Sequence, residues 1–123
     1  MTDYDASIEA AGEQAADHRY KDAYNTLGGA LRIGGRRDWE CRYRRGVYAL
    51  RVAQTRLDTL ADNPDADGPL SKIACWLSRS QAYLMSSSEE ASANQLDEIA
   101  GYLEDLRAQQ DRFRDRWGTT APA

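Results

Sequence analysis

Apolar residues recur along this chain at spacings of three and four, the pattern of helices that bury one face. The longest run lies between residues 39 and 60 and comprises Trp39, Tyr43, Gly46, Leu50, Ala53, Leu57 and Leu60. A second run has one polar member and comprises Leu96, Ile99, Leu103, Leu106, Gln110, Phe113 and Trp117. Sustained spacing of this kind is typical of helices that pack lengthwise in bundles. We therefore predict two unbroken helices whose apolar edges face inward.

Turn-forming residues separate these segments from each other and from shorter helices. Pro64 and Pro69 bracket a stretch rich in Asn, Asp and Gly, so a loop is expected there. A turn near His18 and the pair Gly34-Gly35 end the first two helices. The expected helices cover about residues 4–17, 20–33, 37–61, 70–85 and 87–117.

The start of the last helix is predicted from its serines. Ser87 and Glu90 have the spacing of a capping box, in which a hydroxyl and a carboxylate satisfy free backbone N–H groups at a helix start. Strand-like alternation of β-branched residues is missing from the sequence. The predicted fold class is all-α, a compact four- to five-helix bundle of mostly antiparallel helices. It forms a single domain over residues 1–117, followed by a flexible tail over residues 118–123.

One helix of the chain resembles part of a known repeat. Its residues Tyr20, Ala23, Leu27, Ala30 and Leu31 are similar to the second helix of a tetratricopeptide repeat, where small residues let paired helices approach closely. The preceding helix does not match the consensus, and no second copy follows about 34 residues later. A solenoid needs several stacked repeats, so the pattern does not predict one.

Composition fits a folded domain without a membrane span. The 123 residues are 41% hydrophobic and 29% charged, which is ordinary for globular proteins. No apolar stretch approaches the roughly 20 residues that cross a bilayer. The acidic amino terminus lacks the basic and apolar blocks of a secretory signal, so we expect a cytoplasmic protein. Cys41 and Cys75 are then expected to be reduced thiols.

The sequence offers little for catalysis or metal binding. Its single histidine, His18, is expected in a turn without an oriented partner, and no Glu-x-x-His motif of a di-iron bundle is present. Glu9, Glu13 and Asp17 share a helical face, which we interpret as a solvated acidic surface. We therefore expect no catalytic residue, no metal, no cofactor and no enzymatic activity.

The strongest functional signal is a stripe of arginines on the helix that contains residues 39–60. Residues 32–56 contain eight arginines against Asp38 and Glu40, in a chain of net charge −4. Helical spacing aligns Arg37, Cys41, Arg44, Tyr48 and Arg51, with Arg45 beside them. We expect this stripe to face outward, where guanidinium groups suit carboxylates or phosphates.

Three roles are open for the stripe. It pairs with the six acidic residues between Glu89 and Asp105, it binds a protein partner with an acidic surface, or it binds nucleic acid. The prediction is a non-catalytic interaction, adaptor or scaffold protein, a small accessory protein of a bacterium or phage. Its predicted partner-binding residues are Arg37, Arg44, Arg45, Tyr48 and Arg51. The alternative is a nucleic-acid-binding small helical subunit that contacts phosphates through the same residues.

The helix expected at residues 70–85 suggests a second surface. Trp76 and Tyr83 form an apolar stripe beside its main apolar face, and the two stripes together exceed what one small bundle easily covers. We therefore predict self-association into a homodimer through Trp76 and Tyr83, and no membrane contact.

Overall fold

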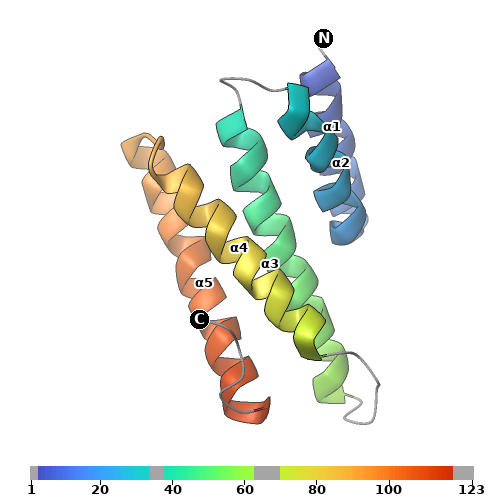
Figure 1. The fold of residues 1–123 in the computed structure, drawn as a ribbon, viewed down its shortest axis with the longest axis vertical. Helices are drawn as coiled ribbons and strands as arrows, with labels where there is room; N and C mark the ends of the chain where they lie inside the picture. The colour runs from blue at the N-terminus through green and yellow to red at the C-terminus, as the bar shows by residue number, and fades with distance from the viewer. Residues whose placement is uncertain (1–2, 34–37, 63–69, 118–123) are drawn as a thin grey trace.

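The structure is a computed structural model that describes residues 3–33, 38–62 and 70–117. Over these residues the chain forms five helices and no strand, as predicted: α1 (Asp3–Ala16), α2 (Tyr20–Ile33), α3 (Asp38–Asp62), α4 (Leu70–Ser88) and α5 (Ala93–Trp117) (Figure 1). The predicted loop around Pro64 and the predicted tail at 118–123 lie outside the described residues. None of the described helices combines the length and the apolar character that a bilayer crossing requires.

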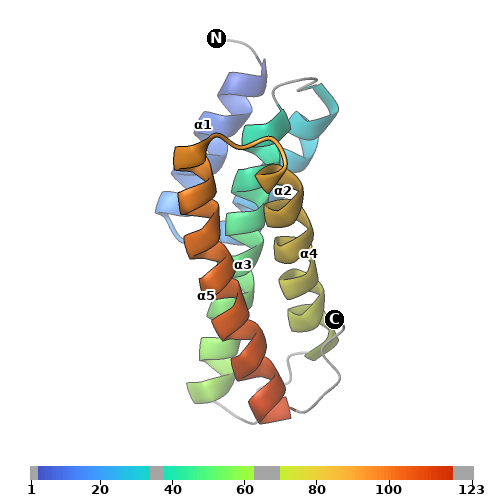
Figure 2. The same cartoon turned by 90° about the vertical axis from the view of Figure 1, so that its left-hand side faces the viewer.

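The helices surround a central pair formed by α3 and α4. The α2 helix packs on one side of α3 and the α5 helix on the other, while α1 packs mainly on α2 (Figures 1 and 2). Successive helices run antiparallel, as predicted for a bundle (Figure 1). Because α3 contacts three other helices, most of its circumference is covered.

The apolar seam predicted for residues 39–60 is the centre of the core. Its members from Gly46 to Leu60 are buried, and Trp39 and Tyr43 are partly buried. The second seam is confirmed for Ile99, Leu106 and Phe113 of α5. At its amino-terminal end the prediction is wrong for Leu96, whose surface is 43% exposed.

Gly46 allows α3 and α4 to approach closely. A Cβ atom built on Gly46 would lie 2.8 Å from Cγ and 3.1 Å from the backbone nitrogen of Leu84 in α4. The hydroxyl of buried Ser80, also in α4, donates a hydrogen bond to the Gly46 carbonyl at 2.8 Å. A side chain at position 46 would therefore force the two central helices apart.

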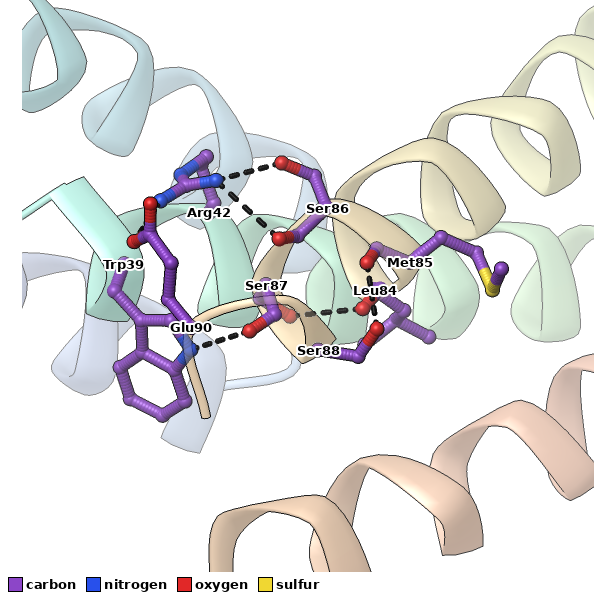
Figure 3. Close-up of polar contacts among 8 residues, drawn as sticks. All are labelled: Trp39, Arg42, Leu84, Met85, Ser86, Ser87, Ser88 and Glu90. Carbon is purple, nitrogen blue, oxygen red and sulfur yellow. Dashed lines mark hydrogen bonds and ion pairs between the residues drawn. The ribbon is translucent and has the colours of Figure 1, made fainter. Parts of the chain in front are cut away.

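The carboxyl end of α4 is fixed by side chains of α3. The Trp39 indole donates to the Ser87 carbonyl at 2.6 Å, and the Arg42 guanidinium donates to the carbonyl and hydroxyl of Ser86 (Figure 3). The Ser88 hydroxyl donates to the Met85 carbonyl at 2.7 Å. Carbonyls in the last turn of a helix lack partners within that helix, so these donors complete its end. A cation at this end also suits the helix dipole.

The predicted capping box at Ser87 and Glu90 is therefore wrong. Ser87 is buried inside the last turn of α4, and its hydroxyl donates back to the Leu84 carbonyl at 2.9 Å (Figure 3). The helix α5 instead starts after Ser92. The Gln95 side chain accepts from the Ser92 backbone N–H at 2.8 Å, and the Ser92 hydroxyl accepts from the Gln95 N–H at 3.4 Å. This reciprocal pair is a capping box five residues later than expected.

Candidate functional site

The predicted arginine stripe does not form a continuous outward face. Cys41 and Tyr48 are 0% and 7% exposed, and Arg45 lies between helices. Arg37 lies outside the described residues. The expectation of an outward stripe is wrong because α2 packs against the same side of α3, where the Cys41 thiol donates to the Leu27 carbonyl at 3.1 Å.

Arg45 joins three helices. Its Nε donates to the Tyr24 carbonyl of α2 at 3.2 Å, and its Nη1 donates to the Tyr83 hydroxyl of α4 at 2.5 Å. The guanidinium carbon also lies 3.8 Å from the centre of the Tyr24 ring, in a cation–π contact. Burial raises the pKa of the Tyr24 phenol, while the positive charge of Arg45 lowers it. This geometry gives Arg45 a structural role in holding α2 on α3 and α4.

Of the predicted self-association residues, Trp76 is buried within the chain and Tyr83 is partly buried. The Tyr24 ring of α2 contacts Trp76 edge-on, with ring centroids 4.9 Å apart, and contacts Tyr83 in the same manner at 6.1 Å. Trp76 is consequently only 5% exposed. The second apolar stripe of α4 is therefore used to bind α2, and its residues do not form an exposed patch.

Arg44 and Arg51 reach solvent along a narrow open strip of α3. Arg44 pairs with Glu40 at 3.1 Å. Burial lowers the pKa of the Arg44 guanidinium, but the neighbouring Tyr48 and Glu40 raise it by more, so the pKa lies above its ordinary value. Arg51 pairs with Asp105 of α5 at 3.0 Å. Both side chains are about one-third exposed, 37% and 31% respectively. Thr55 continues the strip and is exposed.

A hollow of about 340 Å³ lies on the α5 side of this strip. We call it the acidic hollow, and it is lined by Arg51, Asp97, Glu98, Gly101, Tyr102 and Asp105. Three carboxylates thus face one guanidinium, and that guanidinium is already paired with Asp105. Asp97 has no hydrogen bond or ion pair to another described residue, and Glu98 accepts a long hydrogen bond of 3.5 Å from the Tyr43 hydroxyl. The hollow carries surplus negative charge.

A second hollow, of about 200 Å³, lies on the other side of the strip, where the turn between α1 and α2 meets α3. We call it the basic hollow, and residues 18–22 line it together with Val52, Thr55 and Arg56. Arg19 pairs with Asp22 at 2.9 Å. The side chains of Lys21 and Arg56 have no hydrogen bond or ion pair to another residue in the described part of the chain. The hollow therefore carries surplus positive charge.

The histidine and the two cysteines are the remaining side chains that the sequence analysis considered for chemistry. His18 is exposed in the turn, and its Nδ1 is 3.0 Å from the Tyr20 hydroxyl. Among the described residues, no three His, Cys, Asp or Glu side chains are grouped to hold a metal. The Cys41 side chain is buried, and the Cys75 side chain is exposed.

No protein-family model, curated protein or solved structure matches this chain.

Apart from Arg51, the residues that line the two hollows were not among the predicted site residues. The surplus of acids between Glu89 and Asp105 was a usable signal, because two of those acids, Glu90 and Asp105, pair with arginines of α3. Asp97 and Glu98 remain available to a partner. The basic hollow had a weaker signal, because Lys21 and Arg56 are far apart in sequence and meet through the packing of α2 on α3.

Proposed function

We propose that this protein is a non-catalytic interaction module that binds a partner polypeptide across the open strip of α3. The observation that carries the proposal is the pair of oppositely charged hollows on the two sides of Arg51 and Thr55. Each hollow has charges without a partner in the described chain, and complementary charges give an interface its orientation and specificity. The same pair of hollows offers no nucleophile with an oriented base.

The proposal keeps two of the predicted partner-binding residues. Arg44 and Arg51 reach solvent along the strip, so they remain candidate contacts. Arg45 and Tyr48 are assigned to the packing of α2 and α3. A homodimer through Trp76 and Tyr83 is not proposed, because Tyr24 contacts both rings and Trp76 is buried. A cytoplasmic location remains an expectation from the sequence.

The nucleic-acid alternative has less support than a protein partner. The acidic hollow would bring Asp97 and Glu98 against a phosphate backbone, and like charges brought together at an interface are unfavourable. Several arginines of α3 are also paired within the chain, among them Arg42 with Glu90 and Arg51 with Asp105.

Site-specific photo-crosslinking tests the proposal. A benzophenone amino acid replaces exposed Thr55 in the strip or, as the matched control, exposed Lys72 on α4, and each variant is irradiated in source cells. We expect a discrete protein adduct from position 55, its loss when Arg56→Glu is added, and no adduct from position 72. Equal adducts from both positions, or none from position 55, would contradict the proposal.

A further inference from the structure

We propose that the segment bound across α3 is extended and carries both charges, a basic residue in the acidic hollow and an acidic residue in the basic hollow, about three or four positions apart. This inference rests on the proposed function and specifies the chemistry of the partner.

The acidic hollow fits a lysine or arginine side chain. Asp97 and Glu98 supply carboxylates that no described cation neutralises, and the Tyr102 ring lies beside them. Gly101 leaves the middle of this surface open, since a Cβ built there would meet no atom within 4 Å. A cation that enters gains charge-assisted hydrogen bonds from the carboxylates and an attraction to the aromatic face.

The basic hollow fits a carboxylate. Lys21 and Arg56 approach it from two different helices, and neither has an acidic partner among the described residues. The Arg56 guanidinium presents paired N–H donors that match the two oxygens of a carboxylate. Thr55 lies on the α3 edge of the same hollow. An aspartate or glutamate of the partner would supply the missing counter-charge.

The separation of the hollows sets the spacing of the two charges. Both hollows border the same turn and a half of α3, one at Arg51 and the other at Val52, Thr55 and Arg56. A segment that joins them crosses one helix, whose diameter with side chains is about 10–12 Å. An extended chain advances about 3.3–3.6 Å per residue, so the crossing takes about three or four residues.

A segment with charge of a single sign fits poorly. A run of acids would place one carboxylate against Asp97 and Glu98, and a run of lysines would place one ammonium against Lys21 and Arg56. Like-charge contacts of this kind reject wrong partners. The arrangement therefore selects for the order and spacing of charges.

Synthetic peptides test the inference by NMR on the full chain. Five eight-residue peptides share a Gly-Ser background and carry Arg and Glu three positions apart, Arg and Glu adjacent, Arg alone, Glu alone, or Arg and Arg three positions apart. Backbone amide shifts are followed at Gly101 and Tyr102 for the acidic hollow and at Lys21 and Arg56 for the basic hollow. Linking two contacts raises affinity, so we expect the spaced Arg and Glu peptide to bind about tenfold more tightly than either single-charge peptide.

Two variants and a control assign the binding to the hollows. Asp97→Lys should abolish the shifts at Gly101 and weaken the spaced peptide to the level of the Glu peptide. Arg56→Glu should abolish the shifts at Lys21 and weaken the spaced peptide to the level of the Arg peptide. Arg107→Glu changes an exposed residue of α5 that lines neither hollow, so it should leave binding unchanged. Circular dichroism confirms that each variant remains folded.

The outcomes separate this inference from the proposed function. Equal affinity for all five peptides, preference for a single-charge peptide, or shifts outside the two hollows would overturn the inference. If position 55 still crosslinks a partner in that case, the interaction module stands and the charge pattern of its ligand is wrong. If the spaced peptide binds as expected and each hollow variant weakens it to the level of a single-charge peptide, the charge pattern is supported independently of the crosslinking result.

Discussion

His18 ends α1 in a backbone conformation that favours glycine. Its φ is 61°, the left-handed region, which no other described non-glycine residue adopts. The His18 N–H donates to the Ala15 carbonyl and the Arg19 N–H donates to the Gln14 carbonyl, both at 2.9 Å. These two bonds form a Schellman motif, whose left-handed position is usually glycine. The turn therefore carries a steric cost that the hydrogen bonds offset.

We predict that His18→Gly stabilises the protein. Removing Cβ relieves a left-handed strain of about 1–2 kcal/mol, while glycine adds about 0.5–1 kcal/mol of backbone entropy to the unfolded state. The expected net gain in the free energy of unfolding is about 0.5 kcal/mol, measured by urea denaturation. Both variants lose the contact of the imidazole with Tyr20, but His18→Ala also keeps the strain, so it should not stabilise. A gain for alanine equal to that for glycine would show that strain is not the cause.

Because of Tyr43, we predict that the free energy of unfolding falls at alkaline pH. Burial raises the pKa of its hydroxyl above the ordinary value near 10, and Tyr102 and Glu98 raise it further. The folded state therefore holds this proton while the unfolded chain releases it, so the stability it contributes is present below pH 10 and lost as the pH rises through the folded pKa. For a half-buried ring the effect is about 0.5 kcal/mol at pH 11.

The comparison of wild type with Tyr43→Phe isolates that effect. Urea denaturation at pH 8 and pH 11 should show a smaller alkaline loss in the variant, because phenylalanine has no proton to release. Tyr24 has a raised pKa as well and still titrates in both proteins, so it cancels in the difference. An identical alkaline loss in both proteins would rule out Tyr43 as its source.

Among the elements, the close contact of α3 with α4 depends on the absence of a side chain at Gly46. We predict that Gly46→Ala lowers the free energy of unfolding by about 1–2 kcal/mol, because overpacking against Leu84 outweighs the gain of about 1 kcal/mol in helix propensity. Gly29→Ala is the matched control in α2, where a Cβ meets no atom within 4 Å. It should stabilise by about 0.5–1 kcal/mol in the same thermal or urea assay. A stabilising Gly46→Ala would refute the close-approach argument.

The helices themselves were predictable from apolar spacing, and their ends were less so. The seam at residues 39–60 can be found within one segment of the sequence, because all its members lie on the same face of the helix. The start of α5 was misplaced because Ser87 and Ser92 both precede a Glu or Gln by three residues. What decides between them is tertiary: Trp39 and Arg42, 48 and 44 residues before their partners, complete the end of α4 at Ser88.

The site was less predictable than the fold for a related reason. A helix with one apolar seam was assumed to have one covered face, so Arg45 and Tyr48 were expected in solvent. The helix α3 instead contacts α2, α4 and α5, which leaves a narrow open strip. Whether an arginine faces water or a tyrosine ring then depends on where α2 docks. The apolar spacing of residues 20–33 predicts a buried face on α2, but it does not specify which side of α3 that face covers.

For the whole molecule, α2 attaches the first two helices to the other three. The helix α1 packs mainly on α2, and α2 packs mainly on α3 besides α1. Arg45 lies at this junction and has no carboxylate partner among the described residues. Its stabilising contacts are hydrogen bonds to the Tyr24 carbonyl and the Tyr83 hydroxyl and cation–π contacts with the two tyrosine rings. The basic hollow spans the same junction, with residues 18–22 on one side and α3 on the other.

Arg45→Met should therefore loosen α1 and α2 in preference to the rest of the bundle. Methionine keeps an apolar stem but loses the charge-assisted hydrogen bonds and the cation–π contacts, a loss of about 2 kcal/mol. Hydrogen exchange should speed up in α1 and α2 while amides of α3 and α4 keep their protection, and Arg107→Met on the exposed side of α5 should change neither. Uniform loss of protection across all five helices would contradict this division. Because α2 carries Lys21, the spaced Arg and Glu peptide should also lose its contact in the basic hollow while shifts at Gly101 persist.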